Sequence, residues 1–355
     1  MKCLLRIRTP ALVQTGAIAD PIMTWIRRWH EPGEFELTIP YRTGIEYDSI
    51  LCQCAINGVR EAGVVRGCVI EASEKNGDVM KLTGPLLAGY AQQRIVWGTQ
   101  TITGTPETVM KELVYRNMGA GADAARQFAG LSIEADQGLS GASIDYQNTD
   151  VPLNEELNRL SKDSGLGYDI VIGTGMVFRV LEGLDRTSGQ SVNPRAVFSI
   201  ENKSLMTAEF EKNGTKYTNV AKISSELYTE VFGTATGYER YETFVKPSGI
   251  EKDEEGNDNS EAVQRTIMLQ QGEQKLTPMT LCFTCRVDPE GNLKYRENYD
   301  LGDIVTCAVK RWGVSLDARI TEIKEIYTVS GLGLEITFGT GLLTVGKNIR
   351  RIANG

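Results

Sequence analysis

The chain has 355 residues, of which 41 % are hydrophobic and 7 % aromatic, values typical of a folded protein with roughly two to four domains. Its 38 Lys and Arg against 46 Asp and Glu give a formal net charge of -8, which argues against broad binding to a phosphate backbone. No run approaches the ~18 apolar residues that cross a bilayer, and the N-terminus lacks the pattern of a signal peptide. The seven scattered cysteines favour folding in a reducing cytosol.

The first hundred residues predict β structure. Phe35, Leu37 and Ile39 alternate with polar residues after a Glu-Pro-Gly turn, which is the pattern of a half-buried hairpin. Further strands are predicted over residues 2–8, 23–30, 50–56, 68–72 and 79–83. These strands are enough to close a small β-barrel, and we assign residues 1–104 to a first barrel domain.

The apolar period changes at Thr105 from two residues to about 3.6, which predicts a helix. Thr105 is a good N-cap and Pro106 suits the first helical position, while Gly119 is expected to end the helix. A second helix is predicted over residues 151–162, followed by a hairpin of 168–172 with 176–181. Residues 105–196 therefore predict an α+β unit.

Strands resume at residue 196, and an acidic stretch at 248–262 is interpreted as a solvated loop. Ser260 is expected to cap a helix that Gly272 ends, and strand is predicted again over 278–287. Because this helix interrupts a β region, we expect residues 246–297 to pack on residues 105–196 as one discontinuous middle domain. Residues 197–245 plus 298–355 then form a second barrel.

The segment from Tyr299 to Gly339 predicts a β-meander, with strands at 304–309, 318–327 and 334–338. A similar pattern occurs earlier: placing residues 69–71 on residues 320–322 also places Ile56 on Cys307. We therefore predict a duplication in which residues 304–338 superpose on residues 51–83. The predicted fold class is α+β, mainly β, with two related small β-barrels and a discontinuous α+β middle domain.

Candidate catalytic and metal-binding residues are few. His30 is the single histidine, so zinc sites with two histidines are excluded, and its place at a strand end favours a surface or rim residue over a catalytic base. Cys282 and Cys285 have CxxC spacing, but their predicted strand sends them to opposite faces. Cys52 and Cys54 share a strand face and are interpreted as packing residues. We predict no catalytic, metal-binding or cofactor-binding residues and no cofactor.

Two carboxylate pairs, Glu71 with Glu322 and Asp300 with Asp303, could act as glycosidase acids. Turn chemistry already explains Asp300 and Asp303, and sequence spacing gives no separation in space. Arg186, next to an aspartate in a tight turn, is interpreted as a loop anchor. No GxxxxGK[ST] phosphate loop is present. Four tryptophans, in strands or beside them, suggest either core packing or sugar binding: Trp25, Trp29, Trp97 and Trp312.

The order and spacing of several motifs resemble the tail-hub proteins of long-tailed, non-contractile bacteriophages and prophages, which are related in architecture to the baseplate hub of contractile tails. The motifs are Gly33-Glu-Phe-Glu-Leu-Thr-Ile-Pro40, Leu82-Thr-Gly84, Arg94, Thr105-Pro-Glu107, Gly165-Leu-Gly-Tyr168, Gly183-Leu-Asp-Arg-Thr187, Val197-Phe-Ser199 and Tyr299-Asp-Leu-Gly-Asp303. The resemblance spans nearly the whole chain and implies a homotrimer whose two β-barrels per subunit form a pseudo-six-fold ring. Many relatives continue into a hydrolase or fibre, whereas this sequence stops at Gly355, which puts a lytic role in doubt.

The resulting hypothesis is a structural, non-enzymatic hub at the distal tip of the virion tail, made in the host bacterial cytoplasm. Implied partners are further copies of the chain, the tail tube or distal tail ring, the tape-measure protein, a tail fibre or spike, and DNA passing without sequence-specific binding. An acidic subunit would repel that DNA. Two alternatives stay open: a tail-associated enzyme that degrades cell walls, and a carbohydrate-binding module for host recognition.

Overall fold

The computed structural model describes residues 3–55, 58–72, 77–247, 250–251, 258–277, 279–339 and 349–351. The chain divides into two compact units. Unit 1 is drawn from Met1–Ala208 and Thr284–Phe338, and unit 2 chiefly from Glu209–Phe283. The fold class is confirmed as α+β and mainly β.

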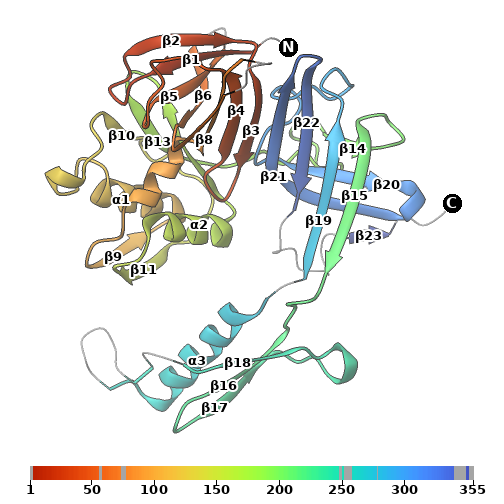
Figure 1. Cartoon of the computed structure of the whole chain (residues 1–355). Coiled ribbons are helices and arrows are strands. Elements are labelled where there is room, and N and C mark those ends of the chain that lie inside the picture. Colours follow the sequence, from red (N-terminus) through yellow and green to blue (C-terminus); the bar gives the residue numbers. More distant parts are fainter. Residues whose placement is uncertain are drawn as a thin grey trace. The chain divides into compact units, whose positions relative to one another are not determined.

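The largest sheet of the structure joins strands from both ends of the chain (Figure 1). Its main path has the order β15-β19-β22-β21-β3-β4-β8-β7. The bounds are β3 Ile22–Arg28, β4 Glu34–Pro40, β7 Gly67–Glu71, β8 Val79–Pro85, β15 Leu205–Asn213, β19 Thr280–Val287, β21 Val314–Thr328 and β22 Gly331–Phe338. The predicted N-terminal barrel is not closed among the described strands, because β3 pairs with β4 on one side and, on the other, with β21 from the C-terminal region.

A second sheet of unit 1 has the order β2-β1-β5-β6. Its strands are β1 Leu4–Arg8, β2 Gln14–Ala19, β5 Ile50–Ala55 and β6 Gly58–Val64. Both faces of β5 are buried: Ile50 and Cys52 belong to one hydrophobic cluster, and Leu51 between them belongs to the other. This sheet therefore separates these two hydrophobic clusters, as period-2 alternation requires.

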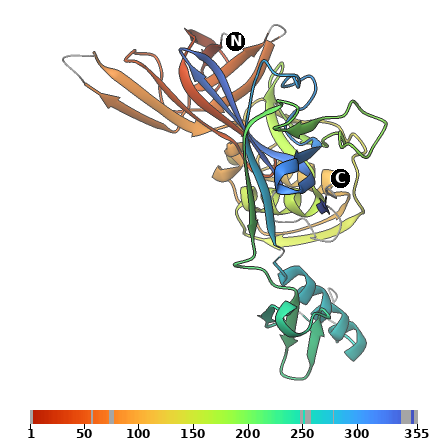
Figure 2. The ribbon, with the colours of Figure 1, turned by 90° about the vertical axis from the view of Figure 1, so that its right-hand side faces the viewer.

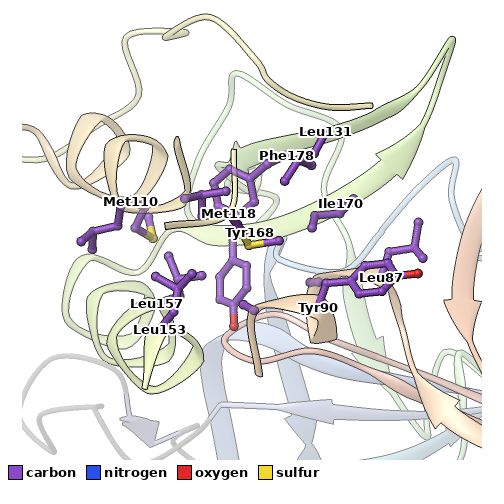
Figure 3. Packing of buried hydrophobic residues seen from close by; sticks show 14 of the residues in the cluster. Leu87, Tyr90, Met110, Met118, Leu131, Leu153, Leu157, Tyr168, Ile170 and Phe178 are labelled. Atoms are coloured by element: carbon purple, nitrogen blue, oxygen red, sulfur yellow. The ribbon is translucent and has the colours of Figure 1, made fainter. Parts of the chain in front are cut away.

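The α+β region of unit 1 follows the sequence expectation closely. Its elements are the 3-10 helices Leu87–Gln93 and Ala124–Arg126, β9 Thr99–Gly104, α1 Pro106–Asn117, β10 Leu131–Ile133, β11 Ile144–Thr149, α2 Leu153–Ser164, β12 Gly167–Ile172 and β13 Met176–Leu181. Thr105 caps α1 by accepting a hydrogen bond from the Thr108 amide, and Gly165 ends α2 in the left-handed conformation. Figure 3 shows side chains of α1, α2 and the β12–β13 hairpin meeting around Met118, Tyr168 and Phe178.

The predicted meander is confirmed as β20 Ile304–Val309, β21 and β22, with β14 Val197–Ser199 beside β20 and β23 Ile349–Arg351 beside β21. A 3-10 helix at Lys310–Trp312 and Gly313, at φ +63°, turn β20 into β21. The proposed duplication stays a prediction. Two of its positions differ in environment, since β7 lies at a sheet edge and β21 inside the sheet, and Ile56 lies outside the described residues.

Unit 2 contains a small sheet of order β17-β16-β18, with helix α3 against one face (Figure 2). The bounds are β16 Val220–Ser224, β17 Thr229–Phe232, a 3-10 helix Gly237–Glu239, β18 Glu242–Val245 and α3 Glu261–Lys275. Gly272 does not end α3, because it lies inside the helix where a Cβ atom would collide with Ile223. This tertiary contact places α3 on β16, whereas the sequence predicted packing on residues 105–196. The division into three domains is otherwise a prediction that the two units do not decide.

Candidate functional site

A group of buried charges lies where β3 pairs with β21. Arg27 forms ion pairs with Glu61 of β6 and with Asp300, the latter at 2.5 Å. Arg296 lies 3.2 Å from Glu61 and 3.0 Å from Glu325 of β21. These five residues are here called the buried ion cluster, although the Asp300 side chain is 42 % exposed, and they join segments that are more than 200 positions apart in sequence.

Glu325 is the most deeply buried member of the cluster, with 0 % of its surface exposed. The hydroxyls of Tyr295 and Tyr327 donate hydrogen bonds to its carboxylate at 2.7 and 2.8 Å. Burial raises the pKa of Glu325, but the positive charges of Arg296 and Arg27 outweigh burial and lower it overall. The carboxylate is therefore ionised and fully partnered, which is the condition for a tolerable buried charge.

A cavity of about 250 Å³ adjoins the cluster within unit 1. Its charged lining includes Arg27, Arg28, Arg179, Glu61, Asp169, Glu182, Asp300 and Asp303. Asp169 lies 3.5 Å from Arg179, and burial raises the pKa of Asp169 to about 6, against the opposing effect of Arg179. Burial therefore outweighs the neighbouring cation at this position.

Two turns selected in the sequence meet beside this cavity. Arg186 donates to Asp303 at 2.8 Å, and the Leu184 amide donates to the same carboxylate at 2.9 Å. The Asp300 amide donates to Asp303 as well, at 3.0 Å. At Gly183 a Cβ atom would collide with the carbonyl of the opposite turn. Asp303 and Arg186 are thus engaged in holding the two turns together, as turn chemistry predicted.

The second candidate carboxylate pair is far apart. Glu71 lies on β7 and Glu322 on β21, four strand positions away along the sheet. At ~4.8 Å per strand the four steps across the sheet alone separate them by about 19 Å or more, well beyond the roughly 9.5 Å of a glycosidase pair. Each is also in an ion pair, Glu71 with Lys81 at 3.2 Å and Glu322 with Arg28 at 2.9 Å. This pair does not form a hydrolytic site.

His30 is partly buried instead of lying on the surface. Its Nδ1 atom is 2.8 Å from the Ser161 hydroxyl, which itself donates to the Leu166 carbonyl. Burial, helped by Arg319 and Lys162, lowers the pKa of His30 to about 4. The imidazole is therefore neutral at pH 7 and serves as a packing and hydrogen-bonding group.

The cysteines occupy strand positions. Cys282 and Cys285 lie in β19, and their odd spacing sends them to opposite faces. Cys52 is fully buried, and burial raises the pKa of its thiol to about 11, which suits a packing residue. Among the described residues no group of three or more His, Cys, Asp or Glu side chains could hold a metal ion.

The four tryptophans divide into two pairs. Trp25 and Trp29 are buried, and Trp25 donates to Glu61 of the cluster at 3.0 Å. Trp97 and Trp312 are exposed, at 63 % and 40 %, each beneath an arginine in a cation–π contact. The core role predicted for tryptophans in strands therefore holds for the first pair.

Above the buried ion cluster, the opposite face of the same sheet carries exposed charges. Strand registers place alternate residues of β7, β8, β4, β3, β21 and β22 on this side, here called the polar face. Its ion pairs are Arg28 with Glu34 at 2.6 Å and with Glu322 at 2.9 Å, Lys81 with Glu71 at 3.2 Å, Lys324 with Glu335 at 3.1 Å, and Arg286 of β19 with Glu335 at 2.9 Å. Most of the charge on this face is therefore locally neutralised.

Among the residues that the structure describes, β7 and β15 at the two ends of the main path each pair with one strand only. Val69 and Ile70 on β7 are each 56 % exposed, and Met206 on β15 is 61 % exposed. Ile70 lies opposite the buried Met80 and is therefore on the core side of the sheet. Unlike Met80, its side chain is exposed. Edges with apolar residues are surfaces that pair readily with another strand.

The buried ion cluster was missed from the sequence. The sequence contained one indication. Ile323 and Tyr327 are on the buried side of β21, and Glu325 lies between them on the same side. A carboxylate in the buried phase of a strand requires a cationic partner, but only the fold identifies Arg296 and Arg27 as those partners.

Solved structures share the fold over almost the full length. The tail protein from Neisseria meningitidis MC58 matches at a TM-score of 0.58 and 13% identity, covering 95% of this chain and 96% of that one. The 43 kDa tail protein of prophage MuSo2 from Shewanella oneidensis matches at 0.57 and 12%, covering 95% and 98%. Prophage tail protein gp18 from Listeria monocytogenes EGD-e matches at 0.53 and 13%, covering 96% and 94%.

No curated protein matches this sequence. Within the described residues no helix is both long and apolar enough to span a membrane. The family model described as Siphovirus ReqiPepy6 Gp37-like protein matches residues 4–340, which agrees with the resemblance found in the motifs. The chain therefore belongs to the Siphovirus ReqiPepy6 Gp37-like protein family.

Proposed function

We propose that this chain is a structural protein of a phage or prophage tail and that it acts by symmetric assembly. Family membership and the fold shared with three tail proteins support a place in the virion tail. The engagement of Asp303, Glu71 and Glu322 in structural ion pairs supports a role without catalysis. Three of the four acids considered for a cell-wall enzyme are thus already held in ion pairs within the chain, and the fourth, Asp300, pairs with Arg27.

The observation that carries the assembly proposal is the pair of edge strands, β7 and β15. In the proposed ring, β7 of one copy pairs with β15 of the next, so that the sheets of all copies join. Such a head-to-tail contact uses two different surfaces and closes into a ring when the rotation between copies allows. Three copies, as the family resemblance implies, would give a homotrimer with pseudo-six-fold character if the predicted duplication is real.

In this proposal the ring sits at the distal end of the tail tube, with the polar face toward a channel for DNA. The tube or distal tail ring, the tape-measure protein and a fibre or spike are its proposed partners. The charge pairing of the polar face fits a conduit, since paired charges hold passing phosphates weakly.

The test compares the mass of the full chain by light scattering over a range of concentrations, with negative-stain images of the particles. We expect the native chain to reach about three times its 39.1 kDa mass and to form rings. Ile70→Asp places a charge on the β7 edge and should give monomers, because edge charges block strand addition.

Ile22→Asp is the matched control, since Ile22 is 53 % exposed but lies on β3 inside the sheet. This variant should assemble like the native chain. A native chain that stays monomeric at every concentration, or that forms only dimers, contradicts the ring, as does normal assembly of Ile70→Asp.

A further inference from the structure

The polar face has almost no net charge although the chain is acidic. Four cations lie on it, Arg28, Lys81, Lys324 and Arg286, with five carboxylates, Glu34, Glu36, Glu71, Glu322 and Glu335. The formal charge of -8 for the whole chain therefore resides mainly elsewhere. Simple repulsion by an acidic surface, which the sequence suggested, does not describe this face.

Each cation of the face is held by at least one carboxylate. Arg28 contacts Glu34 and Glu322 on the neighbouring strands, and Glu31 before β4 at 3.5 Å. Glu335 contacts both Lys324 and Arg286 and is thereby shared between two cations. Cross-strand registers fix this arrangement, because Arg28 lies directly opposite Glu322 and Lys324 directly opposite Glu335.

Glu335 holds its charge near neutral pH. A hydrogen bond from Arg286 lowers the pKa of Glu335 against the effect of burial, and Lys324 lowers it further. Glu36 lies on the same face and forms no ion pair among the described residues, which leaves a small negative excess. A phosphate that approaches the face therefore meets cations whose charge is already compensated.

We propose that the carboxylates of the polar face keep its arginines and lysines from binding nucleic acid. Without them, Arg28 and Lys324 on the paired strands β3 and β21, together with Arg286 on β19 and Lys81 on β8, would leave the face with uncompensated positive charge. Phosphate contacts by Lys and Arg release counterions and produce sequence-independent binding, which a surface along a DNA path must avoid. The inference rests on the proposed function only in naming DNA as the polymer that passes this face.

The experiment measures binding of a fluorescently labelled DNA duplex of about 20 base pairs by anisotropy, at ~50 mM and ~200 mM salt. The full chain carrying Glu34→Gln, Glu322→Gln and Glu335→Gln changes the face from one net negative to two net positive charges. We expect no saturable binding by the native chain. The variant should bind at least about tenfold more tightly, with most of the gain lost at the higher salt concentration.

A control variant carries Glu155→Gln, Glu226→Gln and Glu297→Gln, three exposed positions outside the strands of the face, and has the same net charge change. It should bind no better than the native chain. Glu335→Gln alone is a milder variant that frees Lys324 and Arg286 and should show a smaller gain. Binding by the native chain itself, or equal binding by the two triple variants, overturns the proposal. None of these outcomes depends on ring formation, so the two proposals fail separately.

Discussion

Strands β3 and β21 carry charged residues on both of their faces, and the two faces differ in what those charges do. On the core side, Arg27 and Glu325 belong to the buried ion cluster, whereas Arg28 and Glu322 pair on the polar face. Both faces use arginine and glutamate side chains. Arg27 and Arg28 are adjacent on β3, and Glu322 and Glu325 are close together on β21. The two groups differ in burial. A buried charge needs its ion-pair partner for the protein to stay stable, whereas water can solvate an exposed charge when its partner is removed.

The largest loss in the free energy of unfolding is expected when a charge is removed from the core side of the sheet. Glu325→Gln keeps the shape of the side chain but removes one of the two buried anions near Arg296 and Arg27, so that only Glu61 remains. We expect a loss of about 3 kcal/mol or more in the free energy of unfolding, measured by urea denaturation. A loss below about 1 kcal/mol would show that water already compensates the cluster.

The cavity beside the cluster gives an intermediate effect that depends on pH. Because the pKa of Asp169 is raised to about 6 in the fold, its protonated form stabilises the protein at low pH, and this stability is lost as pH rises from ~4 to ~6. Asp169→Asn should remove that dependence. The difference in unfolding free energy between variant and native chain should grow by about 1 to 2 kcal/mol across this window, discounted for the partial exposure of Asp169.

Urea denaturation at a series of pH values checks this expectation, and the native chain measured in the same buffers is the reference. Other carboxylates titrate equally in both proteins, so only Asp169 contributes to the difference. A difference that does not change with pH would mean that Asp169 is well solvated in the cavity.

The smallest effect is expected on the polar face. Glu322→Gln is the same substitution on the same strand as Glu325→Gln, but the side chain of Glu322 is 33% exposed. Its ion pair with Arg28 should contribute no more than about 1 kcal/mol, and urea denaturation provides the measurement. A loss as large as that of Glu325→Gln would erase the distinction between the two faces.

Local patterns in the sequence predicted most of the helices and strands and several of the residues at which they begin or end. Thr105 and Pro106 determined the start of α1, Gly165 determined the end of α2, and the meander was predicted from turn residues and short β-branched runs. These features depend on contacts within a few residues, which the sequence contains directly. Gly272 was misjudged because its reason, close packing on Ile223, lies in another segment.

The sequence by itself determined the family, the mainly β class and the structural role of the turn aspartates. Only the tertiary structure decided that β3 pairs with β21, which leaves the sheet open at β7 and β15 and brings Arg27, Glu61 and Glu325 together. The physical reason is that strand pairing and ion pairing join residues by distance in space. Periodic patterns within a short segment do not indicate which distant charge or which distant strand that segment will contact in the fold.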